Sequence, residues 1–239
     1  MLSEAEGGWR PVSAPSAMPF SERTPVPVAM TLDDIARVVG NFRDAAARAL
    51  AAGFHVIELH GAHGYLLHEF LSPLSNVRAD AYGGSFENRI RLTLETVDAV
   101  REVWPAHLPL FVRLSATDWA KGGWDVDQSV ELSRRLGQHG VDLVDVSSGG
   151  NVSGVKIPVG PGYQVEFAER IRRDSGIATG AVGMITDPHQ ADSIVRSGQA
   201  DVVFLARQLL REPYWPLRAA RELGVTVPWP PQYERAAQL

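Results

Sequence analysis

Hydrophobic positions recur with a helical period along much of the chain, and short apolar runs separate these segments. The first helical pattern follows Thr31, whose hydroxyl is suited to cap a helix, and it stops at Gly53. Its apolar positions are Ile35, Val38, Val39, Phe42, Ala46, Ala49 and Leu50. Residues 1–30 are rich in Pro and Ser, so we expect an irregular lead-in without strands there.

The same alternation of apolar run and helical pattern continues along the chain. Strands are predicted at residues 54–59, 109–115, 141–147, 177–182 and 201–206. Helices are predicted between them at about 86–103, 127–138, 163–174 and 187–197. Gly140, Gly176 and Gly198 each stand shortly before a predicted strand, as loops from helix to strand require.

Strands joined by single helices predict right-handed crossovers and a parallel sheet covered by helices. Both an open doubly wound sheet and part of a (β/α)₈ barrel satisfy this order. Polar residues and glycines follow strand after strand, which favours a barrel whose site lies at the C-terminal ends of its strands. We therefore expect an α/β fold of TIM-barrel type with about five of the eight βα units, in which residues 1–239 form a single domain.

Composition narrows the possible partners. The chain has 239 residues, of which 45% are hydrophobic and 21% charged, and its formal net charge is -5. This charge provides no basic field for nucleic acid or an anionic membrane, so neither partner is expected. The absence of Cys excludes disulfides, thiolate metal sites and cysteine nucleophiles. No apolar run approaches the roughly 18 residues of a membrane span, and we predict a cytoplasmic protein.

The segment from His60 to Tyr65 is the sharpest local signal of chemistry. Its two imidazoles and one phenol can converge on a small polar group, and the intervening glycines let a ligand approach the backbone. His60 and His63 are also compatible with a metal site that takes His68 or Glu69 as a third ligand. Hydrogen bonding to the backbone is the remaining interpretation of either histidine.

Arg113 ends an apolar strand, where a permanent charge must meet a partner. That partner is either a ligand or a carboxylate of the sheet such as Glu58 or Asp145. Further along, Gly183 and the Ala206-Arg207 pair follow the last two predicted strands. Small residues at these ends, followed by a helix N-terminus, are typical of phosphate sites in barrels, and a glycine there is also ordinary in a loop.

Residues 60–89 resemble the central signature of the old yellow enzyme family, FMN-dependent ene-reductases also called NADH:flavin oxidoreductases. The resemblance begins with HGAHGY at 60–65 and continues through FLSPLSNVRADAYGGSFENR at 70–89. It extends to PSAMPF at 15–20, VRLS at 112–115, DVSSGG at 145–150, VGMI at 182–185, AR at 206–207 and LREPYWP at 210–216. The ending QYER at 232–235 is similar to the thermophilic-like branch of the family.

This resemblance implies a (β/α)₈ barrel with FMN at its C-terminal mouth and NADPH or NADH as the hydride donor. The substrate would be a small α,β-unsaturated molecule, an alkene conjugated to a carbonyl or nitro group. By position in the motif, His60 and His63 would donate hydrogen bonds to the substrate oxygen, as neutral imidazoles. Tyr65 would be the proton donor to the α-carbon.

The resemblance also implies the residues that hold the cofactor. Arg113 would lie near N1 and O2 of the flavin, and Gly183 with Ala206 and Arg207 would hold the phosphate. Arg235 would reach into the site of a neighbouring subunit and bind substrate there, so a homo-oligomer is expected. No metal is implied.

The family domain has about a hundred residues before the position that matches Met1, within the usual size of such barrels. We therefore expect open sheet edges at 54–59 and 201–206, and a complementing N-terminal segment as a partner. Two other functions remain open on the sequence. One is a non-catalytic or split-enzyme barrel fragment that binds a complementary chain, and the other is a metal-dependent barrel hydrolase that uses His60 and His63.

Overall fold

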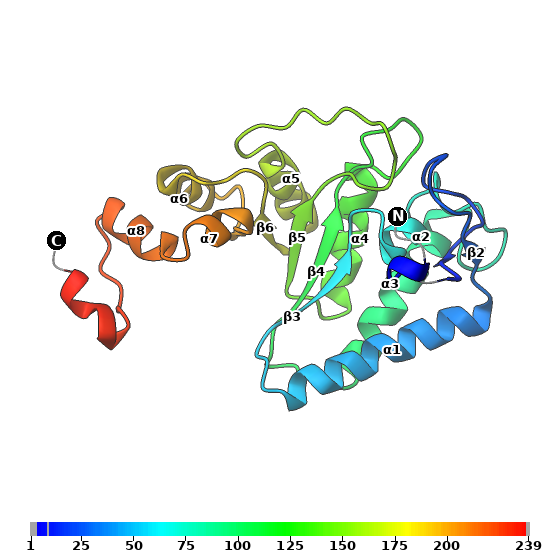
Figure 1. Ribbon diagram of the computed structural model, residues 1–239, viewed down its shortest axis with the longest axis horizontal. Coiled ribbons are helices and arrows are strands. Elements are labelled where there is room, and N and C mark those ends of the chain that lie inside the picture. The colour runs from blue at the N-terminus through cyan, green and yellow to red at the C-terminus, as the bar shows by residue number, and fades with distance from the viewer. Residues whose placement is uncertain (1–3, 9, 238–239) are drawn as a thin grey trace.

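The computed structural model describes residues 4–8 and 10–237, and at its centre is a parallel sheet of five strands in chain order (Figure 1). The strands are β3 (Ile57–Gly61), β4 (Leu110–Ser115), β5 (Leu143–Ser147), β6 (Ala178–Ala181) and β7 (Val202–Val203). Each strand pairs with the next one along the chain, with helices between them. This is the order of consecutive βα units, and the predicted α/β fold is confirmed.

Helices separate and cover the strands. They are α1 (Leu32–Ala51), α2 (Leu66–Leu71), α3 (Phe86–Arg101), α4 (Val126–Gln138), α5 (Val165–Ser175), α6 (Pro188–Arg196), α7 (Arg207–Arg211) and α8 (Trp215–Glu222). Four of them begin at side chains that accept the N3 amide hydrogen bond: Thr31, Ser85, Asp125 and Asp187. Thr31 forms a complete capping box with Asp34, so the predicted start of the first helix is confirmed.

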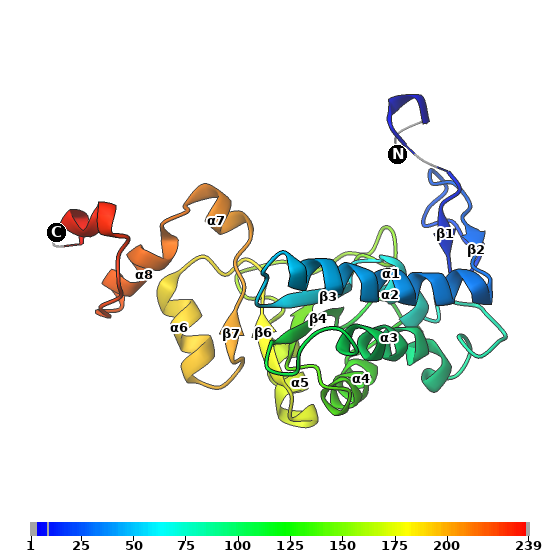
Figure 2. The same cartoon turned by 90° about the horizontal axis from the view of Figure 1, so that it is seen from below.

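The two faces of the sheet differ in chemistry, because successive residues of a strand point to opposite faces. Helices α3, α4 and α5 cover one face of the sheet (Figure 2). On that face the side chains of Val112, Val144 and Ala181 are fully buried. On the opposite face, His60 pairs in register with Arg113, and Arg113 with Asp145. One face therefore supplies the hydrophobic core, and the other carries ionisable side chains.

Two of the five predicted strands differ most from their bounds in the structure. The strand expected at 54–59 begins at Ile57, and Phe54 before it is 60% exposed, because β4 first pairs at Leu110 opposite Ile57. The strand expected at 201–206 is reduced to the two residues of β7, which pairs only with the short β6. The apolar composition of these segments predicted the positions of the strands. Their lengths depend on how many residues the neighbouring strand pairs with, which composition does not show.

The lead-in contains a short element that was not predicted. Strands β1 (Ser13–Ala14) and β2 (Val28–Ala29) pair in parallel, and the 3₁₀ helix η1 (Glu4–Glu6) precedes them. The guanidinium of Arg78 donates to the carbonyl of Pro15 at 2.9 Å and to that of Met30 at 2.7 Å. The side chain of Arg78, which is distant in the sequence, therefore holds β1 and β2 together. These strands have two residues each and are too short to show an alternation of apolar and polar positions in the sequence.

The C-terminal segment projects from the sheet as an arm of α8 and the 3₁₀ helix η2 (Pro231–Ala236) (Figure 1). The rings of Tyr214 and Tyr233 lie 5.9 Å apart and join the two parts of the arm. Within the described ranges, no helix combines the length and apolar character needed to cross a bilayer.

Candidate functional site

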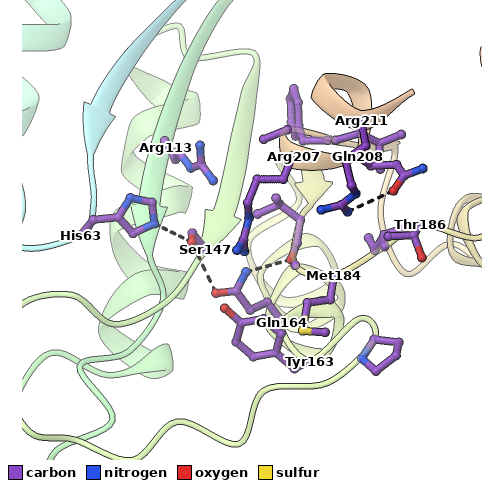
Figure 3. A pocket seen from close by; sticks show the side chains of 17 residues that line it. His63, Arg113, Ser147, Tyr163, Gln164, Met184, Thr186, Arg207, Gln208 and Arg211 are labelled. Carbon is purple, nitrogen blue, oxygen red and sulfur yellow. Dashed lines mark hydrogen bonds between the residues drawn. The ribbon is translucent and has the colours of Figure 1, made fainter. Parts of the chain in front are cut away.

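A cavity of about 490 Å³ lies at the carboxyl ends of the strands (Figure 3). Five residues predicted to form the site line it: His63, Arg113, Gly183, Ala206 and Arg207. They come from loops and strands that are far apart in the sequence, and the parallel order of the sheet brings them to one edge. The structure therefore gathers most of the predicted site around one space.

His60 and Tyr65 lie next to His63 in the structure. The ring of His60 is 5.1 Å from the ring of His63 and 5.4 Å from that of Tyr65, measured between centroids. Tyr65 stands at the N-cap of α2 and is 64% exposed, so its phenol is open to a ligand. The convergence expected of these three rings is present.

The turn at His63 and Gly64 is held tightly. Both residues have positive φ, at 60° and 73°, which is unfavourable for a histidine. The amide of His63 donates to Ser115 Oγ at 3.0 Å. A Cβ on Gly64 would lie 2.3 Å from the carbonyl oxygen of Gly150, so only glycine allows the two backbones to approach this closely.

Ser147 connects His63 to a chain of hydrogen bonds deeper in the site. Its Oγ lies 2.7 Å from Nε2 of His63 and 3.4 Å from Oε1 of Gln164 (Figure 3). The Gln164 amide nitrogen donates to the carbonyl of Val182 at 2.8 Å. The network therefore links the histidine loop to the loop after β6, and Nδ1 is the ring nitrogen of His63 that Ser147 leaves available.

Both histidines are held in the neutral form. Burial lowers the pKa of His63 to about 4, with further contributions from the charges of Arg113 and His60. Burial, followed by Arg113, also lowers the pKa of His60. Desolvation and a nearby cation both disfavour an imidazolium, so at neutral pH each ring has one N–H and one lone pair.

The sequence left two possible partners for Arg113, a ligand or a carboxylate of the sheet, and the structure shows the carboxylate of Asp145. The Nε of Arg113 lies 3.1 Å from Oδ2 of Asp145, whose side chain is only 2% exposed. Burial raises the pKa of Asp145 to about 7; Arg113 opposes this shift, and Glu58 adds to it. Because Asp145 meets Arg113 at Nε, the outer nitrogens of the guanidinium remain directed to the cavity (Figure 3).

Gly183 allows the loop after β6 to pass close to Gln164. Its φ is 126°, and an added Cβ would lie 2.8 Å from Nε2 of Gln164 and 2.9 Å from Cε1 of Tyr163. A side chain here would meet two groups at once and would also strain the backbone. Gln164 itself was missed by the sequence analysis, because a glutamine at the start of a helix carries no distinguishing pattern.

The far end of the cavity is cationic. Arg207 and Arg211 line it from α7, and the structure records no ion pair for either among the described residues. Arg211 donates to Oε1 of Gln208 at 3.1 Å, which is a neutral partner. No Asp or Glu lines this cavity within the described ranges. The donor set therefore fits an anionic group such as a phosphate.

Two further predictions have different outcomes. Arg235 lies on η2 in the projecting arm and does not line the cavity of its own chain, and its reach into a second subunit remains a prediction. His68 is not available as a metal ligand, because its Nδ1 accepts from the Gly64 amide at 3.0 Å and its Nε2 faces Asp118 at 2.9 Å. Among residues 4–8 and 10–237, no three His, Asp or Glu side chains are grouped to hold a metal.

Comparison with known proteins places these features in one family. Residues 3–225 match the NADH:flavin oxidoreductase / NADH oxidase family. The chain is 57% identical over 233 residues to an NADPH dehydrogenase of Geobacillus sp. (strain WCH70), covering 98% of this chain and 67% of the relative. It is 50% identical over 233 residues to an NADPH dehydrogenase of Bacillus subtilis (strain 168), again covering 98% and 67%. The chain thus spans about two thirds of the length of the curated relatives it matches.

Solved structures agree in fold. A 2-naphthoyl-CoA reductase in complex with 2-naphthoyl-CoA is 26% identical, with a TM-score of 0.82 over 89% of this chain and 33% of that one. Morphinone reductase in complex with tetrahydroNAD is 28% identical, with a TM-score of 0.72 over 92% of this chain and 62% of that one. The expected TIM-barrel type is supported by these neighbours, and the sheet order of this chain agrees with it.

Proposed function

This chain belongs to the NADH:flavin oxidoreductase / NADH oxidase family, and from that premise we propose that it is an FMN-dependent oxidoreductase that reduces activated alkenes. Hydride would come from NADPH, in line with the names of its relatives. The observation that carries the proposal is the placement of three proton-bearing rings beside a cationic cavity. The three rings suit a neutral, polarisable substrate, and the cationic cavity suits a cofactor that bears a phosphate.

At the substrate end, His60 and His63 donate hydrogen bonds to the carbonyl or nitro oxygen. His63 donates from Nδ1 while Ser147 Oγ donates to its Nε2, and Ser148 supplies the hydrogen bond to Oε1 of Gln164. The lowered pKa values of the two histidines support this role, since a neutral imidazole offers a donor without bringing a mobile charge into the site. Tyr65 delivers a proton to the α-carbon, and its exposed position beside His60 gives that proton access to a bound ligand.

At the cofactor end, Arg207 and the backbone at Gly183 and Ala206 bind the phosphate. Arg113, oriented by Asp145, would contact the flavin ring system. When bound, FMN supplies the two-electron chemistry that passes hydride from the nicotinamide to the alkene. The side chains of this protein bind the reactants, orient them and hold the proton.

We further propose that residues 1–239 belong to a single FMN-binding domain, which is completed by a further polypeptide segment. A hollow of about 320 Å³ on the ionisable face of the sheet is lined by apolar side chains such as Phe111 and Phe204, together with the charged residues Glu58, Arg113 and Asp145. Strands β3 and β7 stand at the two edges of the sheet. A complementing N-terminal segment covers this face, and Arg235 on the C-terminal arm reaches the site of a second copy. The cytoplasmic location remains a prediction.

The test is titration of FMN by fluorescence quenching, followed by assay of NADPH-dependent enone reduction. We expect the chain alone to bind FMN weakly and to turn over little, and we expect both to rise when an N-terminal fragment designed on a longer relative is added. Light scattering then shows whether the complex is an oligomer. If FMN binds tightly but no alkene is reduced under any condition, the proposed reaction is wrong. If the chain alone binds tightly and turns over fully, the proposed completion is wrong.

A further inference from the structure

Beneath the histidine loop lies a buried pair of ionisable side chains that the proposed reaction does not use. His68 on α2 is fully buried, and its Nε2 lies 2.9 Å from Oδ1 of Asp118, which is also buried. The two residues come from different parts of the chain, α2 and the loop after β4. A buried pair of this kind is costly to form and requires further hydrogen bonds to be tolerated.

Asp118 receives those hydrogen bonds. Its Oδ2 accepts from Ser72 Oγ at 2.5 Å and from the amide of Trp124 at 2.8 Å. Burial raises the pKa of Asp118, but hydrogen bonds from His68 and Ser72 outweigh this effect, so the pKa lies below its usual value. The carboxylate is therefore fixed in position and charged at neutral pH.

The orientation of His68 follows from its two contacts. Nδ1 accepts a hydrogen bond from the amide of Gly64 at 3.0 Å, so Nδ1 has no proton. The proton of the neutral ring must then be on Nε2, which faces the carboxylate of Asp118. Asp118 thus selects the tautomer of His68, and the tautomer allows His68 to hold Gly64.

Gly64 is the residue between His63 and Tyr65. Its turn contains two successive residues with positive φ, and one of them is His63. Without His68, the partly buried amide of Gly64 would lose its acceptor, and the turn would lose one of the contacts that hold its positive-φ conformation. We expect relaxation of this turn to move His63 and Tyr65 away from His60, whose ring lies 5.1 Å and 5.4 Å from theirs.

We propose that His68 and Asp118 are positioning residues that hold the Gly64 turn, so that His63 and Tyr65 meet the substrate in the correct geometry. The pair acts on the substrate end alone, because none of its contacts reaches the cationic end of the cavity. This inference rests on the proposed function for its effect on catalysis. Its effect on His63 does not depend on any cofactor.

Two variants separate positioning from packing. His68→Leu keeps much of the volume but removes both polar contacts, whereas the amide of His68→Gln has an acceptor for Gly64 and a donor for Asp118. His139→Leu is the matched control, because His139 forms a 2.6 Å contact with Asp98 at the protein surface. The first readout is ¹⁵N NMR of the histidines in the chain without cofactor.

In the unmodified chain, His68 should show the Nε2–H tautomer, and His63 should not titrate between about pH 5.5 and 8. In His68→Leu, His63 should begin to titrate near the ordinary histidine value of about 6.5, while His68→Gln and His139→Leu leave it unchanged. A proton on Nδ1 of His68 in the unmodified chain would overturn the proposal, even if His68→Leu failed to fold. If His68→Leu lowers the melting temperature but leaves the titration of His63 unchanged, the pair has only a structural role.

The second readout is kinetic and uses the FMN-loaded protein with its completing fragment. We expect His68→Leu to lower kcat/KM for alkene reduction by about 10- to 100-fold and to leave flavin reduction by NADPH nearly unchanged, with recovery in His68→Gln. Equal losses in both steps would contradict a role confined to the substrate end. If no alkene is reduced by the unmodified protein but the NMR result holds, the proposed function fails and the positioning role stands.

Discussion

The two ends of the cavity are built differently. At the histidine end, all five residues of β5 are buried, and His63 is fixed by Ser115, Ser147 and the close approach of Gly64 to Gly150. At the cationic end, β7 has two residues, and α7 carries exposed arginines. Groups that must hold a neutral substrate in one geometry need a rigid support, whereas exposed cations gain their partner when an anion binds.

The largest effect is expected at the histidine end, from Tyr65→Phe. Loss of the phenol proton should slow enone reduction by about 10² to 10⁴, the usual contribution of general acid catalysis. Nitroalkenes, whose anion is stable, should still accept hydride. Single-turnover assays with both substrate classes measure the difference, with the exposed Tyr214→Phe as the control. Unchanged enone turnover would mean that solvent supplies the proton.

His60→Ala and His63→Ala should have the next largest effect. Each removes a donor to the developing oxyanion, which in comparable sites costs about 10² to 10³ in rate. Steady-state assays should show a raised KM for the alkene as well as a lower kcat. His107→Ala, at an exposed histidine outside the cavity, serves as the control. A variant in which only the KM for NADPH changes would place that histidine in another role.

Arg207→Gln tests the cationic end. Removing a charge-assisted hydrogen bond to phosphate should weaken FMN binding by about 10- to 100-fold, the equivalent of about 1.5 to 3 kcal/mol. The loss should shrink at high salt, because the arginine is exposed. Fluorescence titration at two ionic strengths measures it, with the exposed Arg221→Gln on α8 as the control. An equal loss in both variants would show that only the general charge of this region matters.

The smallest effect is expected in the pH dependence of stability. The pKa of His63 falls to about 4 on folding, so the unfolded chain binds more protons between about pH 4 and 6.5, and His63 weakens the fold as pH falls through this range. Asp145, with a pKa raised to about 7, has the opposite sign in the same range. His63→Gln should therefore reduce the loss of stability on going from pH 7 to 5, by about 1 kcal/mol or less after screening. Urea unfolding at both pH values measures it, and a larger loss in the variant would reverse the assigned sign.

Patterns within single segments of the sequence predicted those parts of the fold that depend on interactions between residues close together in the chain. Thr31 with its helix is such a case, because a cap and an apolar stripe are both visible within one segment. The extent of β7 was wrong, because it depends on how far β6 pairs with it. His68 was considered only as a metal ligand, since its partner Asp118 is 50 positions away in the sequence and no short motif joins them. Gln164, which bonds Ser148 and Val182, was missed because a glutamine at the start of a helix carries no distinguishing pattern.

The division of the cavity into two ends is tested most directly in the protein supplied with its completing N-terminal fragment. There the two half-reactions of His63→Ala and Arg207→Gln are measured by stopped flow, with the FMN dissociation constant of each. We expect His63→Ala to bind FMN normally and to be reduced by NADPH at nearly the normal rate, but to pass hydride to the alkene about 10² to 10³ times more slowly. Arg207→Gln should bind FMN weakly and, once saturated, perform both half-reactions nearly normally. Equal damage to both half-reactions in His63→Ala, together with weak FMN binding, would contradict the division and place this histidine in the cofactor site.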